Sequence, residues 1–258
     1  SYRHCFGYCY PLILPCYIMN IAMLMAIMRK EKVSWTEIGL VILFGATFYR
    51  WCKAELSGSV TILVSLAMLI VKTYPKILTS DFILWKVVDR IAVGIYPICV
   101  GVSLWFTFKF DYSIVWMQKL NDMTGGRLYL QSKGFQANGF KLLGDKLFFV
   151  GAGIDAYGEV AQGEYNYVDN IYIALLLRYG ILFSVIAIIL LTVAMYYCYQ
   201  KKMRIWLWML SLWALHGLFE DKMHLAYYNS LLLMIGQAVQ KVDMSFLRAR
   251  KILQKERQ

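Results

Sequence analysis

The sequence predicts an all-α fold, a polytopic membrane helix bundle of about seven spans. The residues are 60% hydrophobic and the mean hydropathy is +0.52, which is high for a soluble domain whose surface must meet water. Apolar runs near the roughly 20 residues that cross a ~30 Å bilayer core recur along the chain. We therefore expect residues 1–258 to form a single membrane domain, interrupted by one long polar segment, 111–169.

The expected spans are the seven apolar runs 8–28, 33–49, 58–71, 91–110, 170–199, 205–219 and 225–239. The third and the last two are short, which favours boundaries that extend into the flanks or spans that lean on neighbours. The run 170–199 is long, so it is either tilted or extends beyond the lipid. Between residues 72 and 90, apolar and charged residues are mixed, which predicts either an interfacial helix before the fourth span or a solvated basic loop.

The distribution of basic residues predicts the orientation. They follow the first, third and fifth spans and fill the tail 240–258, at Arg29, Lys30, Lys32, Lys72, Lys76, Lys86, Arg90, Lys201, Lys202, Arg204 and beyond. Cytoplasmic loops of membrane proteins carry such an excess, so these turns and the tail are expected in the cytoplasm. The segment 111–169 then becomes an extracytoplasmic loop. The net charge of +11 reflects these loops, and nucleic acid is not an expected partner.

The first residues contain neither a start methionine nor a recognisable signal peptide. Ser1 is not a methionine, and no basic region or cleavage pattern of a signal peptide follows it, so we expect some amino-terminal spans to be missing. Cys5 and Cys9 would lie on the oxidising side, where they either pair or stay reduced. The cysteines inside spans, Cys16, Cys99 and Cys198, are expected to be small apolar fillers.

The polar segment opens with two glycines before an arginine. Gly125 and Gly126 permit a sharp turn, and residues 128–141 are expected to be helical. If a helix begins near Arg127, its amino-terminal dipole and the guanidinium point at one place, which favours a phosphate or diphosphate. The alternative is a loop arginine that faces lipid headgroups. We take Gly126 and Arg127 as candidate substrate-binding residues.

Farther along, an apolar run leads into Gly151-Ala152-Gly153, which we interpret as a tight re-entrant turn because the strand and helix of a nucleotide site are missing. Glu159, Glu164 and Asp169 make the rest acidic. Hydrated loop carboxylates are the default interpretation, and a divalent cation is the alternative. No metal or other cofactor is expected.

The end of the polar segment places Asp169 and Asn170 where the chain enters a long span. Either residue is suited to cap that helix. Arg178, about eight residues into the apolar run, is the stronger signal, because a cation at mid-bilayer costs roughly 2.5–3.5 kcal/mol unless it has an anionic partner, a wet cavity or a path to the surface. Asn170 and Arg178 are candidate substrate-binding residues, and Asp169 is a candidate catalytic carboxylate.

The turn between the last two spans carries His216, Glu220, Asp221, Lys222 and His224. His216 and Glu220 are four residues apart, so a continuous helix would present both side chains on one face. An imidazole or a buried carboxylate accepts a hydroxyl proton near neutral pH, which makes both residues candidate catalytic bases. The alternative is a polar hairpin tip whose charges are hydrated.

Four motifs follow one another along the chain: TGGRLYL at 124–130, LFFVGAG at 147–153, VDNIYIALLLRYG at 168–180, and HGLFED at 216–221 with Tyr228 and Asn229 after it. Their order resembles the polysaccharide polymerases of the Wzy class, which are related to the O-antigen ligases. The resemblance covers about 91–239. It implies a GT-C-like membrane glycosyltransferase with more spans than the seven found here.

The resemblance also implies an activity. Such enzymes of the bacterial cytoplasmic (inner) membrane work on its outer side and build O-antigen, capsule or exopolysaccharide. They move a growing glycan from undecaprenyl diphosphate onto a lipid-linked repeat unit, without a metal. Arg127 and Arg178 would stabilise the diphosphate leaving group, and Asp169, Glu220 and His216 compete as the base. The histidine motif of the ligases is not reproduced around His216.

Partners and alternatives follow from the same interpretation. The partners implied are the donor and acceptor glycans on undecaprenyl diphosphate, membrane lipids, an upstream flippase and a chain-length regulator. A different class is transport, as a polysaccharide flippase or small-solute carrier, in which buried charges line a pathway, although no internal repeat is evident. A seven-span receptor is a third interpretation without specific support.

Overall fold

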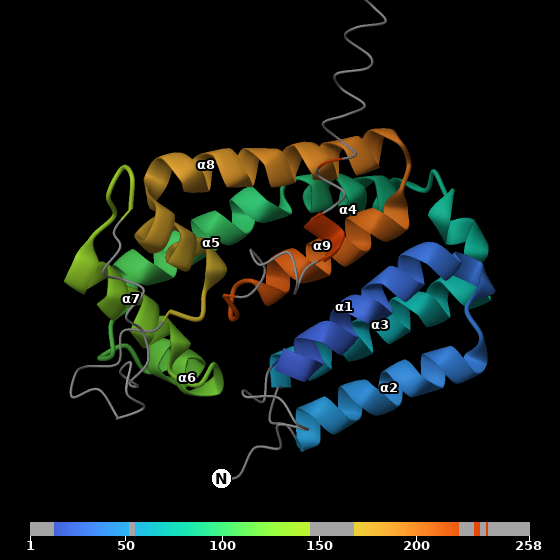
Figure 1. Ribbon diagram of the computed structural model, residues 1–258, viewed down its shortest axis with the longest axis horizontal. Coiled ribbons are helices and arrows are strands. Elements are labelled where there is room, and N and C mark those ends of the chain that lie inside the picture. The colour runs from blue at the N-terminus through green and yellow to red at the C-terminus, as the bar shows by residue number, and fades with distance from the viewer. Residues whose placement is uncertain (1–12, 52–54, 145–167, 222–229, 233–235, 237–258) are drawn as a thin grey trace, which may run out of the picture.

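The computed structural model describes residues 13–51, 55–144, 168–221, 230–232 and 236, which form helices and no β-strand (Figure 1). The helices are α1 (Ile13–Arg29), α2 (Trp35–Arg50), α3 (Glu55–Thr73), α4 (Ile83–Val93), α5 (Ile95–Lys109), α6 (Val115–Met123), α7 (Arg127–Asn138), α8 (Ile171–Gln200) and α9 (Arg204–His216), with short 3₁₀ turns η1 (Lys30–Lys32), η2 (Pro75–Leu78) and η5 (Ser230–Leu232). The all-α expectation is confirmed for this part of the chain.

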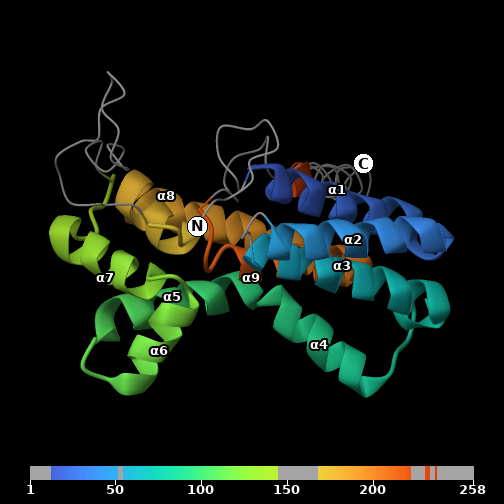
Figure 2. The ribbon, with the colours of Figure 1, turned by 90° about the horizontal axis from the view of Figure 1, so that it is seen from below.

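The long helices form an antiparallel bundle. In Figure 1, α1, α3 and α8 run across the view in one direction, and α2, the α4–α5 pair and α9 return in the other. The helices α6 and α7 lie beyond one end of the bundle, at the left. Figure 2 shows that α4 meets α5 at a marked angle, and the bend between them is 59°. The fold therefore has two ends, one at α6–α7 and one at the turns after α1, α3 and α8.

Three described helical stretches are long and apolar enough to cross a membrane: Ile13–Lys32, Glu55–Thr73 and Ile171–Gln200. The bent pair Ile83–Val93 and Ile95–Lys109 makes a fourth if it is one span. The expected spans 33–49 and 205–219 appear as α2 and α9, which have 16 and 13 residues and fall short of ~20. The expected span 225–239 lies almost entirely outside the described residues. The count of seven spans is therefore not confirmed, whereas the membrane character of the bundle is supported.

The core of the bundle is built from side chains that seven helices contribute. Met19 and Met23 of α1, Val64 of α3, Met195 of α8 and Trp213 of α9 are all buried completely. The thiols Cys16, Cys99 and Cys198 are buried in helices α1, α5 and α8, as expected of apolar fillers. Burial of this apolar face, more than helix propensity, holds such helices in place.

The start of α2 is fixed by a local signal in the sequence. Ser34 accepts a hydrogen bond from the backbone N–H of Glu37 at 3.1 Å, and the Glu37 carboxylate accepts one from the Ser34 N–H at 2.6 Å. This reciprocal pair is a capping box, which satisfies two backbone donors that a helix start leaves free.

Helix α8 is broken at Gly180, where φ is +83° and ψ is 174°, a conformation open to glycine alone. The freed N–H groups of Ile181 and Leu182 donate to the carbonyls of Lys141 and Leu142, at 3.0 and 3.1 Å. A Cβ atom on Gly180 would lie 2.3 Å from the backbone nitrogen of Gly144. The segment after α7 is therefore joined to α8 at this break, which lies within the expected span 170–199.

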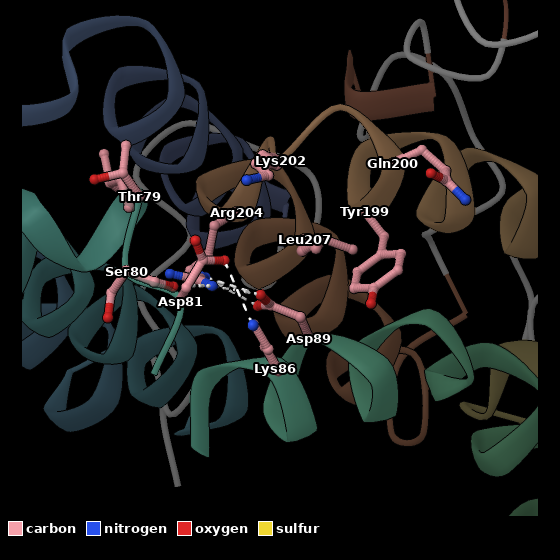
Figure 3. A pocket seen from close by; sticks show the side chains of 11 residues that line it. Thr79, Ser80, Asp81, Lys86, Asp89, Tyr199, Gln200, Lys202, Arg204 and Leu207 are labelled. Carbon is pink, nitrogen blue, oxygen red and sulfur yellow. Dashed lines mark hydrogen bonds and ion pairs between the residues drawn. The ribbon is translucent and has the colours of Figure 1, made fainter. Parts of the chain in front are cut away.

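The opposite end of the bundle is tied by one buried ion pair (Figure 3). Arg204, at the start of α9, donates to the carboxylate of Asp89 on α4 through Nε and a terminal nitrogen, at 2.7 to 3.1 Å. It also donates to the carbonyls of Ile77 and Ser80. A buried guanidinium needs such a full set of acceptors, so Arg204 fixes α4, η2 and α9 relative to one another.

Several expectations fall on parts of the chain outside the described residues. These are the Cys5–Cys9 pair, the turn at Gly151 and Gly153, the carboxylates Glu159 and Glu164, and the tail 240–258. Of the expected loop 111–169, residues 115–123 and 127–138 are the helices α6 and α7. The helical expectation for 128–141 is thus confirmed for most of its length.

Candidate functional site

Five charged side chains meet at the α6–α7 end of the bundle. We call them the arginine–carboxylate cluster: Arg127, Asp169, Arg178, Glu220 and Asp221. They come from the start of α7, the segment before α8, the first half of α8 and the turn after α9. Four of the five are candidate site residues of the sequence analysis, and the structure brings these four together.

The turn before α7 aims Arg127 into this cluster. Gly126 adopts a left-handed conformation, with φ of +85°, and its N–H donates to the carbonyl of Asn121 at 2.8 Å. The side-chain oxygen of Asn121 accepts from the N–H of Tyr129 and thereby holds the first turn of α7. The expectation that a helix begins at Arg127 is confirmed. Gly126 acts here through the shape of the turn, and its role toward a substrate stays a prediction.

Arg127 bridges two carboxylates that are distant in sequence. Its Nε donates to Asp169 Oδ2 at 3.2 Å, and one terminal nitrogen donates to Glu220 Oε1 at 3.4 Å. The other terminal nitrogen donates to the carbonyl of Thr124 at 3.1 Å. These contacts use three of the five N–H groups of a guanidinium, and the other two have no acceptor in the described part of the chain. The side chain of Arg127 is 24% exposed.

Arg178 has an anionic partner, which is one of the three alternatives that its position in an apolar run left open. One of its terminal nitrogens lies 3.3 Å from Asp221 Oδ2, and both side chains are largely buried. Arg178 stands two residues before the break at Gly180. In the sequence, Asp221 is only one of several charges in a turn, and its position next to Glu220 is the sole hint of its role.

The carboxylates of Asp169, Glu220 and Asp221 lie close together, with oxygen atoms within 4.8 Å of one another. Carboxylates at such distances repel each other unless cations lie between them. Arg127 and Arg178 supply these cations, so three carboxylates and two guanidiniums leave one net negative charge when all are ionised. The arginines account for the close approach of the carboxylates without an added ion.

Asn170 connects helices beside the arginine–carboxylate cluster. Its Oδ1 accepts from the N–H groups of Tyr172 and Ile173, which caps α8 as expected. Its Nδ2 donates to Ser103 on α5 at 2.9 Å and to Gln131 on α7 at 3.0 Å. The buried amide thus joins three helices beside Asp169. These contacts give Asn170 a positioning role, and its assignment to substrate binding stays a prediction.

His216 is placed differently from the expectation. Helix α9 ends at His216 and Glu220 follows in a turn, so the two do not share a helical face. The chain turns after the carboxyl-terminal cap residue Gly217, which brings Glu220 to Arg127 and Asp221 to Arg178. His216 is fully buried, with Nε2 3.0 Å from Ser57 Oγ on α3. The expected pairing of His216 and Glu220 on one helix is therefore wrong.

An apolar cavity of about 380 Å³ lies between α5 and α8. Its lining begins at Tyr172 and Leu175, in the first turns of α8 after Asn170, and reaches past the helix break to Ile189; the other lining residues are Val100, Leu104, Phe108, Phe140, Leu176, Ile181, Ser184, Val185 and Ile188. Nearly all are hydrophobic. The cavity therefore suits a hydrocarbon chain, and its lining starts beside the charged cluster.

Comparison with protein-family models, with curated proteins and with solved structures finds no match to this chain. The interpretation of the cluster consequently depends on its own geometry and chemistry.

Proposed function

We propose that this protein is a bacterial membrane glycosyltransferase that polymerises undecaprenyl-diphosphate-linked repeat units into a surface polysaccharide. The observation that carries the proposal is the contact of Arg127 with both Asp169 and Glu220, at the end of an apolar helix bundle. A cation for a leaving diphosphate and a carboxylate for an acceptor hydroxyl then share one site. The resemblance of the motif order to the Wzy class is consistent with this chemistry.

Arg127 is the proposed partner of the leaving group. In the transfer, the acceptor hydroxyl oxygen bonds to the anomeric carbon of the donor glycan, and the bond from that carbon to the diphosphate breaks. The diphosphate leaves with the electron pair, so negative charge develops on it. The two N–H groups of Arg127 without a described acceptor are suited to bind this charge. Arg178 adds a second positive charge nearby.

Asp169 is the proposed base that takes the proton from the acceptor hydroxyl. Its side chain is 16% exposed, compared with 2% for Glu220 and 7% for Asp221, so among these three carboxylates it is the most accessible to a substrate. Glu220 and Asp221 would then orient Arg127 and Arg178. His216 is less suited to this step, because it is fully buried against Ser57.

The apolar cavity between α5 and α8 supports a substrate with a hydrocarbon tail. A lipid diphosphate would place its head at the arginine–carboxylate cluster and its first isoprenyl units along α8. This arrangement requires the cluster to face the outer side of the cytoplasmic membrane. The basic turns at the other end of the bundle are consistent with that orientation. Additional spans and a GT-C arrangement belong to the same proposal.

The test is incubation of the purified protein with undecaprenyl-diphosphate-linked repeat units. A ladder of products is the expected result for the wild type. Arg127→Ala should lower the rate on the order of 100-fold or more, because a donor to the developing charge is lost. Lys119→Ala, an exposed cation on neighbouring α6, is the matched control and should leave the rate unchanged. A normal ladder from Arg127→Ala would exclude Arg127 from the site.

Two further variants separate the proposed roles. Asp169→Asn should abolish transfer while binding of the lipid diphosphate persists, since the variant loses a base and keeps Arg127. Arg178→Lys should still impair transfer, because an ammonium does not reproduce the planar fork of a guanidinium. Full activity of Asp169→Asn would reassign the base to another carboxylate.

Transport of the same lipid-linked glycan is the second candidate, and one observation favours it. Helix α8 is broken at Gly180 beside the buried Arg178–Asp221 pair, and broken helices with buried charges are typical of transporter sites. Proteoliposomes with the substrate in one leaflet distinguish the two functions. Movement of intact single units to the other leaflet supports transport, whereas longer glycans on one leaflet support polymerisation.

A further inference from the structure

Three membrane-capable helices finish at the end of the bundle away from the cluster. Helices α1, α3 and α8 end at Arg29, Thr73 and Gln200, at the right in Figure 1. Two cavities of about 400 and 220 Å³ lie among the turns that follow, and they share Leu78, Thr79, Lys202 and Arg204. Figure 3 shows the smaller one, with Lys202 and Arg204 at its wall. We call the larger one the basic cavity.

The basic cavity carries positive charge that the described protein does not neutralise. Its lining contains Lys30, Lys201 and Lys202 and a single acidic residue, Glu31. Arg204 also lines it, but Asp89 balances this charge at 2.7 Å. The three lysines make no ion pair with any residue in the described ranges. Three lysines against one glutamate leave two excess positive charges around one cavity.

Two of these lysines stand in an unusual backbone conformation. Lys30 has φ of +48° and Lys202 has φ of +53°, and they are the only non-glycine residues with positive φ in the described part of the chain. A left-handed residue commonly ends a helix, and these two turn the chain after α1 and after α8. Both side chains are exposed and line the same cavity.

The surroundings indicate that the ligand is a lipid headgroup. Trp206 lines the basic cavity and Tyr199 lines the smaller one, and such aromatic residues gather where a membrane helix meets the headgroup layer. Helices α1, α3 and α8 are long and apolar enough to cross a bilayer, so we expect their ends at its surface. Basic pockets between membrane helices on the cytoplasmic side bind anionic headgroups.

We propose that the basic cavity binds the phosphate of an anionic phospholipid headgroup through Lys30, Lys201 and Lys202. The bound headgroup joins the end of α1 to the turn between α8 and α9. This site is separate from the arginine–carboxylate cluster and does not depend on the proposed transferase activity.

The test is titration of the detergent-solubilised protein with a short-chain phosphatidylglycerol, followed by the shift in unfolding temperature. Phosphatidylcholine of the same chain length and inorganic phosphate serve as the comparison ligands. The wild type should bind phosphatidylglycerol in preference to both. Each lysine near the phosphate contributes roughly a fivefold gain in affinity, so Lys30→Gln/Lys201→Gln/Lys202→Gln should weaken binding on the order of 100-fold.

The matched control is Lys32→Gln/Lys76→Gln/Arg90→Gln, which removes three exposed cations from the same end of the bundle but from neither cavity. It should bind phosphatidylglycerol within a few-fold of the wild type. Equal weakening of both triple variants would overturn the site and assign the effect to overall surface charge. Equal stabilisation by inorganic phosphate and phosphatidylglycerol would overturn the lipid as the source of the anion.

A single variant keeps the proposal testable even if the triple lysine variant fails to fold. Lys202→Gly removes one cation and suits the positive φ of this position, so the lipid-free protein should be as stable as the wild type or more stable. Its affinity for phosphatidylglycerol should fall roughly fivefold. Unchanged affinity would exclude Lys202 as a ligand and contradict the proposal.

Discussion

The Arg204–Asp89 pair allows the sharpest test of the packing, through replacement of Arg204 by methionine. The two side chains are only 8% and 9% exposed, so water screens the pair little. Arg204→Met leaves Asp89 charged and buried against α9, and it removes a donor from the carbonyls of Ile77 and Ser80. Loss of one partner of a buried pair destabilises a protein by about 3–5 kcal/mol. We expect a loss in the upper half of that range.

The double variant Arg204→Met/Asp89→Leu isolates the charge. It removes both buried ions and leaves only two carbonyls without their donor, each costing about 1 kcal/mol. The double variant should therefore be more stable than Arg204→Met by about 2 kcal/mol, because an apolar pair of similar volume replaces a buried ion pair at little cost.

The assay is unfolding of the purified protein in mixed micelles by titration with sodium dodecyl sulfate, followed by circular dichroism. The free energy of unfolding of the wild type, both single variants and the double variant forms a complete cycle. A double variant no more stable than Arg204→Met would refute the reasoning. Such a result would mean that the guanidinium stabilises α9 through packing and carbonyl contacts, and that the charge of Asp89 has little effect.

Three further predictions concern local features. Gly180→Ala should destabilise the protein by about 2 kcal/mol or more in the same assay, since a Cβ would meet Gly144 at 2.3 Å, and full stability would show that the break is not needed. Asn170→Asp should keep the cap of α8 but lose about 1–3 kcal/mol, because the amide donors to Ser103 and Gln131 disappear; Asn170→Ala, which also loses the cap, should be worse. Ser34→Ala should cost about 1 kcal/mol, and no loss would show that the capping box is dispensable.

The positions of helices are predictable because their causes are local. The predicted apolar runs 8–28, 58–71 and 170–199 coincide with most of α1, α3 and α8, and the glycines before Arg127 mark where α7 begins. The count of seven spans is not confirmed, because α2 and α9 are apolar but short. Their apolar surface is buried partly against neighbouring helices, and hydropathy alone does not distinguish such packing from contact with lipid.

Four of the five members of the arginine–carboxylate cluster are predictable from the sequence, but their contacts are not. An arginine in an apolar run needs an anionic partner, a wet cavity or a path to the surface, so the position of Arg178 is informative by itself. Which carboxylate neutralises it depends on the turn after α9, and that turn follows from the end of the helix at His216. This is why the spacing of His216 and Glu220 suggests a pair that does not form, while nothing in the sequence distinguishes Asp221.

The sequence by itself determined that this chain is helical and membrane-like, that Arg127, Asp169 and Arg178 are among its candidate site residues, and that its basic residues follow three of its apolar runs. These properties depend on composition and on neighbours along the chain. Only the tertiary structure decided that Arg127 joins Asp169 to Glu220, that Gly180 breaks α8 against the segment after α7, and that Lys30 and Lys202 line one cavity. Each of these contacts joins residues distant in sequence, and it depends on how the helices pack.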